Sequence, residues 1–511
     1  MITLGVLSSH WSGAHLNCTF AVTTAAGINV PATDASGTIF NLPTGVPEVH
    51  VTATPSTTTM YWPTTVVLTV GPSGLTPKAG SEGFVRVQTQ PWLPPGNFLV
   101  MATLLLARVK LDTDNTLSQL NRPPGKRLGE KVDEKTSHKK IWGEDVWPPT
   151  DWKLPDLDSC HFIDPTNPVK SGALNFSTAA LEIDADSVVL RLAGVDAPQI
   201  LAVVWPDAIP RDTNAKPTPF LIFIEQSLNG NHLDRYGLFV GGELDKPENA
   251  YPDNFDYADM LFQQLHYAGL PATPTSAETP ATPFANEGMK GVPYQVARAA
   301  NKAVTVVPMN SFQKQYGVMS KAQNIEEILE EIQAFMYMAK GRAKLPSSLG
   351  RVAMASFSSG NYFLGELLAD ADNRATGFLK NMLKAVYFLD PALDPGKEDV
   401  NTFINSATLW AKDNPDKRIR LYMRDPADAQ KQLLGKNPPS APYVGNTADG
   451  LRTAAQLPKQ VWVAALKTQL GYALPNVDDY WFGFAHHMFA GTMLVHALSQ
   501  KDAHNKTDLD P

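Results

Sequence analysis

Seven continuous apolar runs in the C-terminal two thirds of the chain constrain the fold more than any other feature. They are LAVVW (201–205), PFLIFI (219–224), AVTVV (303–307), VAMAS (352–356), AVYFL (385–389), RIRLYM (418–423) and QVWVAA (460–465). Runs of this length without polar alternation are typical of strands covered on both faces. Helical patterns separate them, and the clearest runs from Asn324, with Glu327 as its expected capping partner. The alternation predicts an α/β fold, a mostly parallel sheet with helices on both faces.

The N-terminal part of the chain has a different pattern. Short alternating runs such as CTFAVTT, EVHVTAT and TVVLTV are separated by turn residues, which predicts an all-β sandwich over residues 1–115. Prolines and mixed charges then indicate a linker or extended surface segment over 116–165. We expect the α/β domain to occupy 166–511, with an insertion at 228–300 that is too long for a plain connector.

Bulk composition limits the classes of partner. The formal charge of -8 argues against nucleic acid or an anionic membrane, since both select for basic faces. The run FLVMATLLLARV (98–109) is about half of the roughly 20 residues that a membrane span needs, so we predict a strand and no transmembrane segment. The N-terminus has no signal-peptide pattern, which fits a cytoplasmic protein or a mature secreted form. Nothing in the sequence indicates a cofactor or an oligomeric state.

The stretch VAMASFSSGNYFLGELL (352–368) joins a buried run directly to a helical pattern. A sharp strand-to-helix turn needs small residues two positions before and two after the side chain that it exposes. Ser356 and Gly360 flank Ser358 in this way, and they match the G-x-S-x-G nucleophile elbow with serine in place of the first glycine. We therefore predict that Ser358 is a nucleophile.

On this motif the chain resembles the α/β-hydrolase superfamily, over roughly residues 180–500. The resemblance implies a serine hydrolase in which Ser358 forms an acyl-enzyme, a histidine takes its proton and a carboxylate orients that histidine. It also implies the chain order serine, acid, histidine.

Two histidines after the last apolar run satisfy that order. His487 is the preferred base because it directly precedes the expected final helix, and His486 is the alternative. Asp425 follows the run that usually precedes the acid in this superfamily, and it is favoured over Asp390, which follows the run before. Asp428 and Asp394 are neighbouring alternatives to these two.

The resemblance also implies two backbone N–H donors for the oxyanion. Ser359, next to the nucleophile, would supply one. The second is expected after PFLIFI, from Gln226 or Ser227, in a loop where Glu225 replaces the usual His-Gly opening.

The leading interpretation is a serine hydrolase that cleaves carboxylic esters of small molecules or polymers, in the manner of an esterase or lipase. An amidase or peptidase would use the same residues, and an inactive β-sandwich adhesion or binding protein is a third interpretation. A metal hydrolase using the two adjacent histidines is disfavoured, because no metal-binding spacing such as HExxH occurs.

Overall fold

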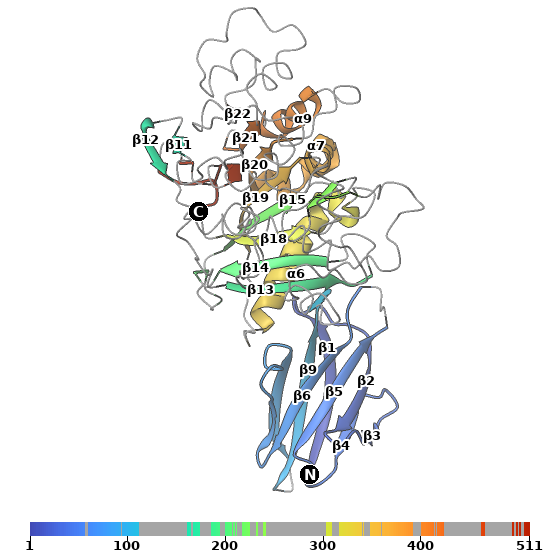
Figure 1. Ribbon diagram of the computed structural model, residues 1–511. Helices are drawn as coiled ribbons and strands as arrows, with labels where there is room; N and C mark the ends of the chain where they lie inside the picture. Colours follow the sequence, from blue (N-terminus) through green and yellow to red (C-terminus); the bar gives the residue numbers. More distant parts are fainter. Residues whose placement is uncertain are drawn as a thin grey trace, which may run out of the picture.

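The computed structural model describes residues 1–111, 161–173, 185–241, 303–423, 461–465 and 493–510, with short gaps inside these ranges. Two groups of strands dominate it. One group lies near the N-terminus and the other forms a large twisted sheet with helices against it (Figure 1).

Two sheets built from the first 106 residues share one core. One has the order β4-β1-β9-β8 and the other β3-β2-β5-β6-β7. The strands of the first are β1 (Ile2–His10), β4 (Ile39–Leu42), β8 (Val85–Trp92) and β9 (Asn97–Leu106). Those of the second are β2 (Cys18–Thr24), β3 (Asn29–Val30), β5 (Glu48–Pro55), β6 (Thr64–Gly71) and β7 (Gly74–Pro77). Alternate side chains such as Leu4, Val51 and Val100 are buried between them, which is the burial that the polar and apolar alternation predicts. We call these two sheets the N-terminal sheet pair.

The pairings within the N-terminal sheet pair are antiparallel with one exception, the parallel pairing of β1 with β9. The apolar run at 98–109 is strand β9 for most of its length, as predicted. No helix in the described part of the chain is long and apolar enough to cross a membrane.

The large sheet has nine strands in the order β10-β13-β14-β18-β15-β19-β20-β21-β22. Its strands are β10 (Val109–Leu111), β13 (Ala185–Leu192), β14 (Ile200–Pro206), β15 (Thr218–Ile224), β18 (Val304–Pro308), β19 (Leu349–Phe357), β20 (Leu383–Leu389), β21 (Arg418–Met423) and β22 (Val461–Ala465). The pairings from β18 to β22 are parallel, and those of β10, β13 and β14 are antiparallel. The predicted mostly parallel sheet is confirmed. Two small hairpins, β11–β12 (His161–Asp164, Asn167–Ala173) and β16–β17 (Asn231–Leu233, Phe239–Gly241), lie outside it.

Three long helices cover one face of the large sheet. They are α6 (Ala322–Ala339), α7 (Gly360–Ala369) and α9 (Val400–Lys412), and their buried residues share one core with Ile222, Met354 and Phe388 of the sheet. The short helix α8 (Ala371–Ala375) follows α7, the one-turn helix η3 (Gly317–Ser320) precedes α6, and η4 (Phe378–Met382) precedes β20.

The opposite face of the sheet is covered by the C-terminal segment. Tyr387 and Arg420 are register partners on β20 and β21, and each neighbours a residue of the helix-side core, so their side chains point to the other face. Both contact Asp508 there. Helical residues 493–494 and 497–498 are buried as well.

Helix α6 begins two residues before Asn324, so the predicted capping pair of Asn324 and Glu327 is wrong. A residue distant in sequence caps the helix instead, because Asn373 Oδ1 accepts the N–H of Ala322 at 2.9 Å. The side-chain amide of Asn324 donates to the carbonyl of Val318 at 2.8 Å.

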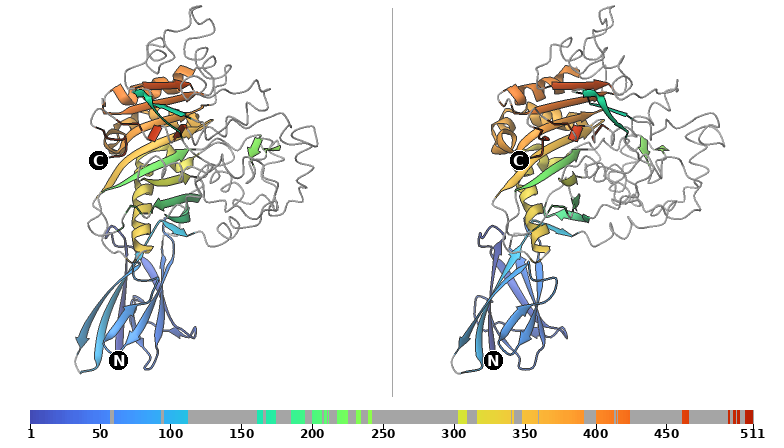
Figure 2. Two further views of the ribbon diagram at one scale, coloured as in Figure 1. Left: turned by 60° about the vertical axis from the view of Figure 1, so that its left-hand side comes forward. Right: turned by 90° about the vertical axis from the view of Figure 1, so that its left-hand side faces the viewer.

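The N-terminal sheet pair is joined directly to the large sheet. Strand β9 ends at Leu106 and β10, an edge strand of the large sheet, begins at Val109. In Figure 2 one end of α6 reaches the sheet pair while its length lies along the large sheet. The predicted boundary near residue 115 lies outside the described residues, and so does the predicted linker at 116–165 except for 161–164, which form strand β11.

Candidate functional site

The corner between β19 and α7 carries the predicted nucleophile. Ser358 has φ of 51° and is 8% exposed. Its N–H donates to the carbonyl of Leu389 on β20 at 3.1 Å, and its own carbonyl accepts the N–H of Asn361 at 3.3 Å. The chain therefore turns from strand to helix within one hydrogen-bonded turn, in the conformation expected of an elbow.

The small residue two positions before the elbow has a visible packing reason. Ser356 is fully buried on β19, and its hydroxyl donates to the carbonyl of Tyr387 on the adjacent strand at 3.4 Å. Serine therefore fills the position where the motif usually has glycine.

Two residues with positive φ angles, Ser358 and Asp390, lie at the same edge of the large sheet. A non-glycine residue in the left-handed region costs about 1 to 2 kcal/mol, and such residues cluster at functional sites. Among the described non-glycine residues, Ser358, Asp390 and Asn505 adopt it. Ser358 and Asp390 follow the carboxyl ends of two neighbouring parallel strands, the edge where ligands bind in sheets of this kind.

Asp390 is a buried acid at this edge. It follows β20 directly, has φ of 42° and is 5% exposed. Its N–H donates to the carbonyl of Tyr422 on β21 at 2.9 Å. Because Ser358 is hydrogen-bonded to Leu389, the residue before Asp390, the backbones of the nucleophile candidate and of this acid candidate are held one strand apart.

The remaining predicted site residues lie outside the described part of the chain; they are Ser359, Gln226, Ser227, Asp425, His486 and His487. The strands that lead to three of them are described. Strand β15 ends at Ile224, whose register partner Ser356 lies two residues before Ser358. Strand β21 ends at Met423, two residues before Asp425.

A buried ion pair ties the C-terminal segment to the strands of this edge. Asp508 Oδ2 accepts hydrogen bonds from Arg420 Nε at 3.2 Å, Arg420 Nη2 at 3.0 Å and the hydroxyl of Tyr387 at 2.9 Å. The side chains of Arg420 and Asp508 are 10% and 9% exposed. Burial, and next the charge of Asp508, raise the pKa of Tyr387 well above its usual value. We call these three residues the C-terminal clamp.

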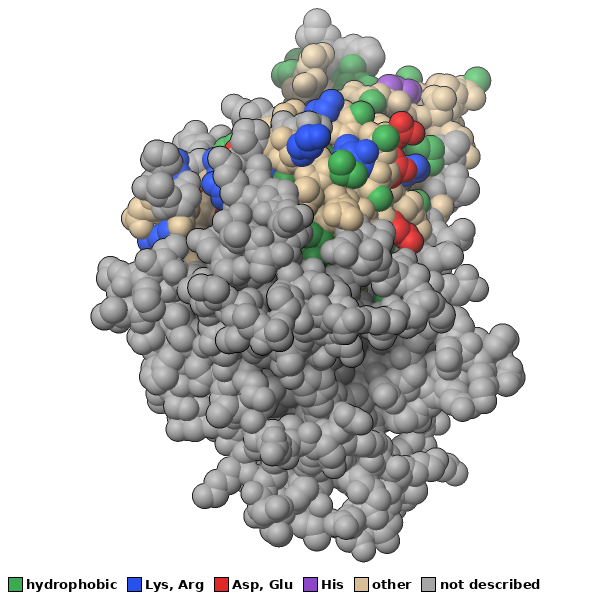
Figure 3. Space-filling view, turned by 90° about the horizontal axis from the view of Figure 1, so that it is seen from above, with side chains coloured by type: hydrophobic (Ala, Val, Ile, Leu, Met, Phe, Trp, Pro, Cys, Tyr) green, Lys and Arg blue, Asp and Glu red, His purple; other side chains and the backbone are tan. Residues whose placement is uncertain are grey.

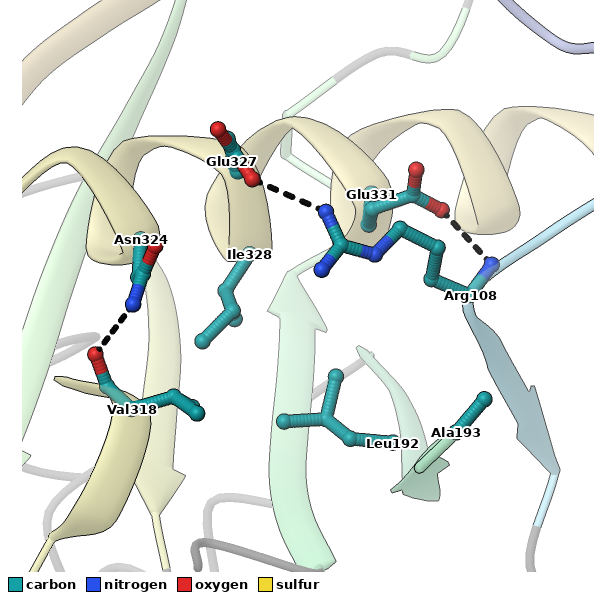
Figure 4. A pocket seen from close by; sticks show the side chains of 8 residues that line it. All are labelled: Arg108, Leu192, Ala193, Val318, Asn324, Glu327, Ile328 and Glu331. Carbon is teal, nitrogen blue, oxygen red and sulfur yellow. Dashed lines mark hydrogen bonds and ion pairs between the residues drawn. The ribbon is translucent and has the colours of Figure 1, made fainter. Parts of the chain in front are cut away.

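A small cavity of about 60 Å³ lies between α6 and the end of β13, beside Arg108, which connects the N-terminal sheet pair to the large sheet (Figure 4). Its polar lining is already paired: Arg108 donates from its guanidinium to Glu327 at 2.8 Å and from its backbone N–H to Glu331 at 3.0 Å. Glu331 also accepts from Trp11 Nε1 at 2.9 Å and contacts His10 Nε2. The cavity is thus part of the contact between the sheet pair and α6, and its polar groups serve that contact.

The described residues contain no group of three His, Cys, Asp or Glu side chains placed to hold a metal ion. His486 and His487, the adjacent histidines of the disfavoured metal-hydrolase interpretation, lie outside the described residues. On the face seen in Figure 3, positive and negative side chains of the described residues lie close to one another.

Two features of the site escaped the sequence analysis. The C-terminal clamp pairs Asp508 with Arg420, 88 positions earlier, and with Tyr387, 121 positions earlier, and no sequence pattern links these residues. Asn361, in the first turn after the elbow, is 1% exposed, and among the described residues neither polar atom of its side chain has a hydrogen-bond partner. The sequence signal that could have indicated Asn361 is a polar residue at the start of the otherwise apolar stretch NYFLGELL.

Comparison with known proteins yields no matching family model and no matching curated protein. The chain has low similarity to several solved structures. A protein named FAE has 12% identity and a TM-score of 0.29 over 63% of this chain and 92% of its own. Pyrococcus horikoshii acylaminoacyl peptidase has 10% identity and a TM-score of 0.26 over 63% of this chain and 42% of its own. S-formylglutathione hydrolase (FrmB) from Staphylococcus aureus has 12% identity and a TM-score of 0.26 over 61% of this chain and 96% of its own.

Proposed function

We propose that this protein is a serine hydrolase of the α/β-hydrolase type that cleaves carboxylic esters through an acyl-enzyme on Ser358. The observation that carries the proposal is the left-handed, largely buried serine at the carboxyl end of a parallel strand, at the start of a helix. A strained conformation at this place supports a role that packing alone does not explain.

In the proposed reaction Ser358 Oγ attacks the acyl carbon of the ester while a histidine, His487 or alternatively His486, takes the hydroxyl proton. The same proton passes to the alkoxide, and the alcohol leaves. Water then attacks the acyl-enzyme with the histidine again as base, which releases the acid and restores the serine. The substrate is an ester of a small molecule or a polymer.

A carboxylate holds the histidine in the productive orientation. The buried position of Asp390, one strand from Ser358, supports it in this role, and Asp425, after β21, is the alternative. Asp390→Asn and Asp425→Asn should separate the two. The variant that lacks the acid should lose about 10⁴-fold in kcat while the other stays close to the unaltered protein.

The proposed oxyanion donors are the N–H of Ser359 and an N–H of Gln226 or Ser227, because negative charge develops on the carbonyl oxygen during attack. The first would lie at the positive end of α7, where the helix dipole favours that charge.

Labelling with a fluorophosphonate probe tests the proposal. The unaltered protein should be modified at Ser358 and the Ser358→Ala protein should not. Ser356→Ala is the matched control, because Ser356 is a buried serine two residues away whose hydroxyl faces β20, and this variant should still be labelled. Absence of labelling in the folded, unaltered protein would refute the proposal and favour a binding protein.

A panel of p-nitrophenyl esters of increasing chain length, with a matching p-nitroanilide, defines the substrate. Hydrolysis of the esters alone would identify an esterase, and loss of activity beyond short acyl chains would exclude a lipase. The rate should fall as the pH drops through the pKa of the histidine, near about 6.5 if unperturbed. A rate that stays flat down to about pH 4 would contradict a histidine base.

A further inference from the structure

The side chain of Asn361 is buried next to the proposed nucleophile. It is 1% exposed, and neither Nδ2 nor Oδ1 has a hydrogen-bond partner within the part of the chain that the structure describes. A buried polar group left in this state costs about 1 to 3 kcal/mol, so such groups are rare and each needs an explanation. Leucine would fill a similar volume at no such cost.

The position of Asn361 relative to Ser358 suggests that explanation. The N–H of Asn361 donates to the carbonyl of Ser358, so the two residues close the first turn of α7. Asn361 therefore lies in the first turn of α7, three residues after the proposed nucleophile. Side chains on a helix also tilt toward its N-terminus, which here is the end that carries Ser358.

The proposed reaction needs hydrogen-bond donors for the oxyanion near Ser358. The loop after β15, from which the second oxyanion donor is expected, opens with Glu225 instead of the usual His-Gly. A side-chain amide in a buried site can serve as an oxyanion donor in place of a backbone N–H, and the positive end of α7 favours the same charge.

We infer that Asn361 is a catalytic residue whose side-chain Nδ2 donates a hydrogen bond to the oxyanion formed when Ser358 attacks the substrate. The inference rests on the proposed function. Oδ1 of Asn361 can accept a hydrogen bond from an O–H or N–H of the substrate. In this proposal the side-chain amide of Asn361 finds its hydrogen-bond partner in the transition state. Its burial lowers the stability of the free protein and serves activity.

Asn361→Leu tests the inference, since it keeps the size of the side chain and removes both polar atoms. We expect kcat on a p-nitrophenyl ester to fall by about 10²- to 10³-fold, the usual loss for one oxyanion donor. KM should stay within about threefold, because the bond forms only in the transition state. The melting temperature should be unchanged or higher, and affinity for a boronic acid that forms a tetrahedral adduct on Ser358 should fall in parallel.

Thr218→Val is the matched control. Thr218 is 1% exposed and its hydroxyl also has no partner among the described ranges, but it lies at the amino end of β15, the opposite edge of the sheet from Ser358. This variant should keep its melting temperature and its kcat. If Asn361→Leu does not fold, Asn361→Ala takes its place with the same criteria.

A folded Asn361 variant that keeps kcat within about threefold would overturn the inference and leave the proposed function standing. If fluorophosphonate does not label Ser358 in the unaltered protein, both fall together. The probe thus separates failure of the reaction from failure of this assignment.

Discussion

Removal of Asp508 should destabilise the large sheet strongly, because it leaves the guanidinium of Arg420 buried without a counter-charge. Asp508 accepts three hydrogen bonds, and the two charged side chains are about nine-tenths buried. Breaking a buried pair of this kind by removing one partner costs about 3 to 5 kcal/mol. We therefore expect Asp508→Ala to lower the free energy of unfolding by that amount.

The surface pair of Lys384 and Asp416 is a matched control. Its 2.6 Å distance is as short as any in the clamp, and it also links β20 to the residues before β21, but Asp416 is 57% exposed. Water competes for the exposed carboxylate of Asp416, so Asp416→Ala should cost less than about 1 kcal/mol.

A double variant separates the charge from the packing. Arg420→Leu with Asp508→Leu removes both ions together, and apolar replacement of a buried pair is commonly neutral or stabilising. The double variant should therefore be more stable than Asp508→Ala alone.

Urea denaturation followed by circular dichroism measures each difference, and hydrogen exchange of β20 and β21 locates it. A loss below about 1 kcal/mol for Asp508→Ala would refute the reasoning, because it would mean that water reaches Arg420 and replaces the carboxylate.

Three further predictions concern the junction and the core. Glu331→Ala removes the acceptor of the ring nitrogens of His10 and Trp11 and of the backbone N–H of Arg108, so it should lower the free energy of unfolding by at least about 2 kcal/mol and speed hydrogen exchange at the junction, while Gln323→Ala, exposed on the same helix, should not. Gly83→Ala should lower the free energy of unfolding by about 1 to 3 kcal/mol, because a Cβ there would lie 1.6 Å from the carbonyl oxygen of Met338. An unchanged melting temperature would contradict that close approach. Burial lowers the pKa of Lys417 to about 8, below its ordinary 10.5. Between pH 8 and pH 10.5 this lysine is therefore protonated in the unfolded chain and neutral in the folded one, so the free energy of unfolding should rise with pH. Urea titrations of the unaltered protein and of Lys417→Met at pH 7.5 and pH 10 check this, since the variant should lack that part of the rise.

The sequence by itself determined the elements whose signals are local. Continuous apolar runs identified the central strands, because a strand covered on both faces has no polar side to show. The spacing of small residues around Ser358 identified the strand-to-helix corner, because steric crowding in that turn acts over five consecutive residues. Prediction of the histidines and of the oxyanion loop came from the resemblance and stays a prediction.

Only the tertiary structure decided which distant groups meet. The cap of α6 comes from Asn373, 51 residues after Ala322, and the partner of Arg420 comes from 88 residues away. The contact of Trp11 with Glu331 spans 320 residues. Hydrogen bonds and ion pairs depend on distances of about 3 Å in space, and a separation in sequence does not fix them. The resemblance favoured Asp425, which lies outside the described residues, and the structure shows the strained, buried position of Asp390 one strand from Ser358, so the choice of acid stays a prediction.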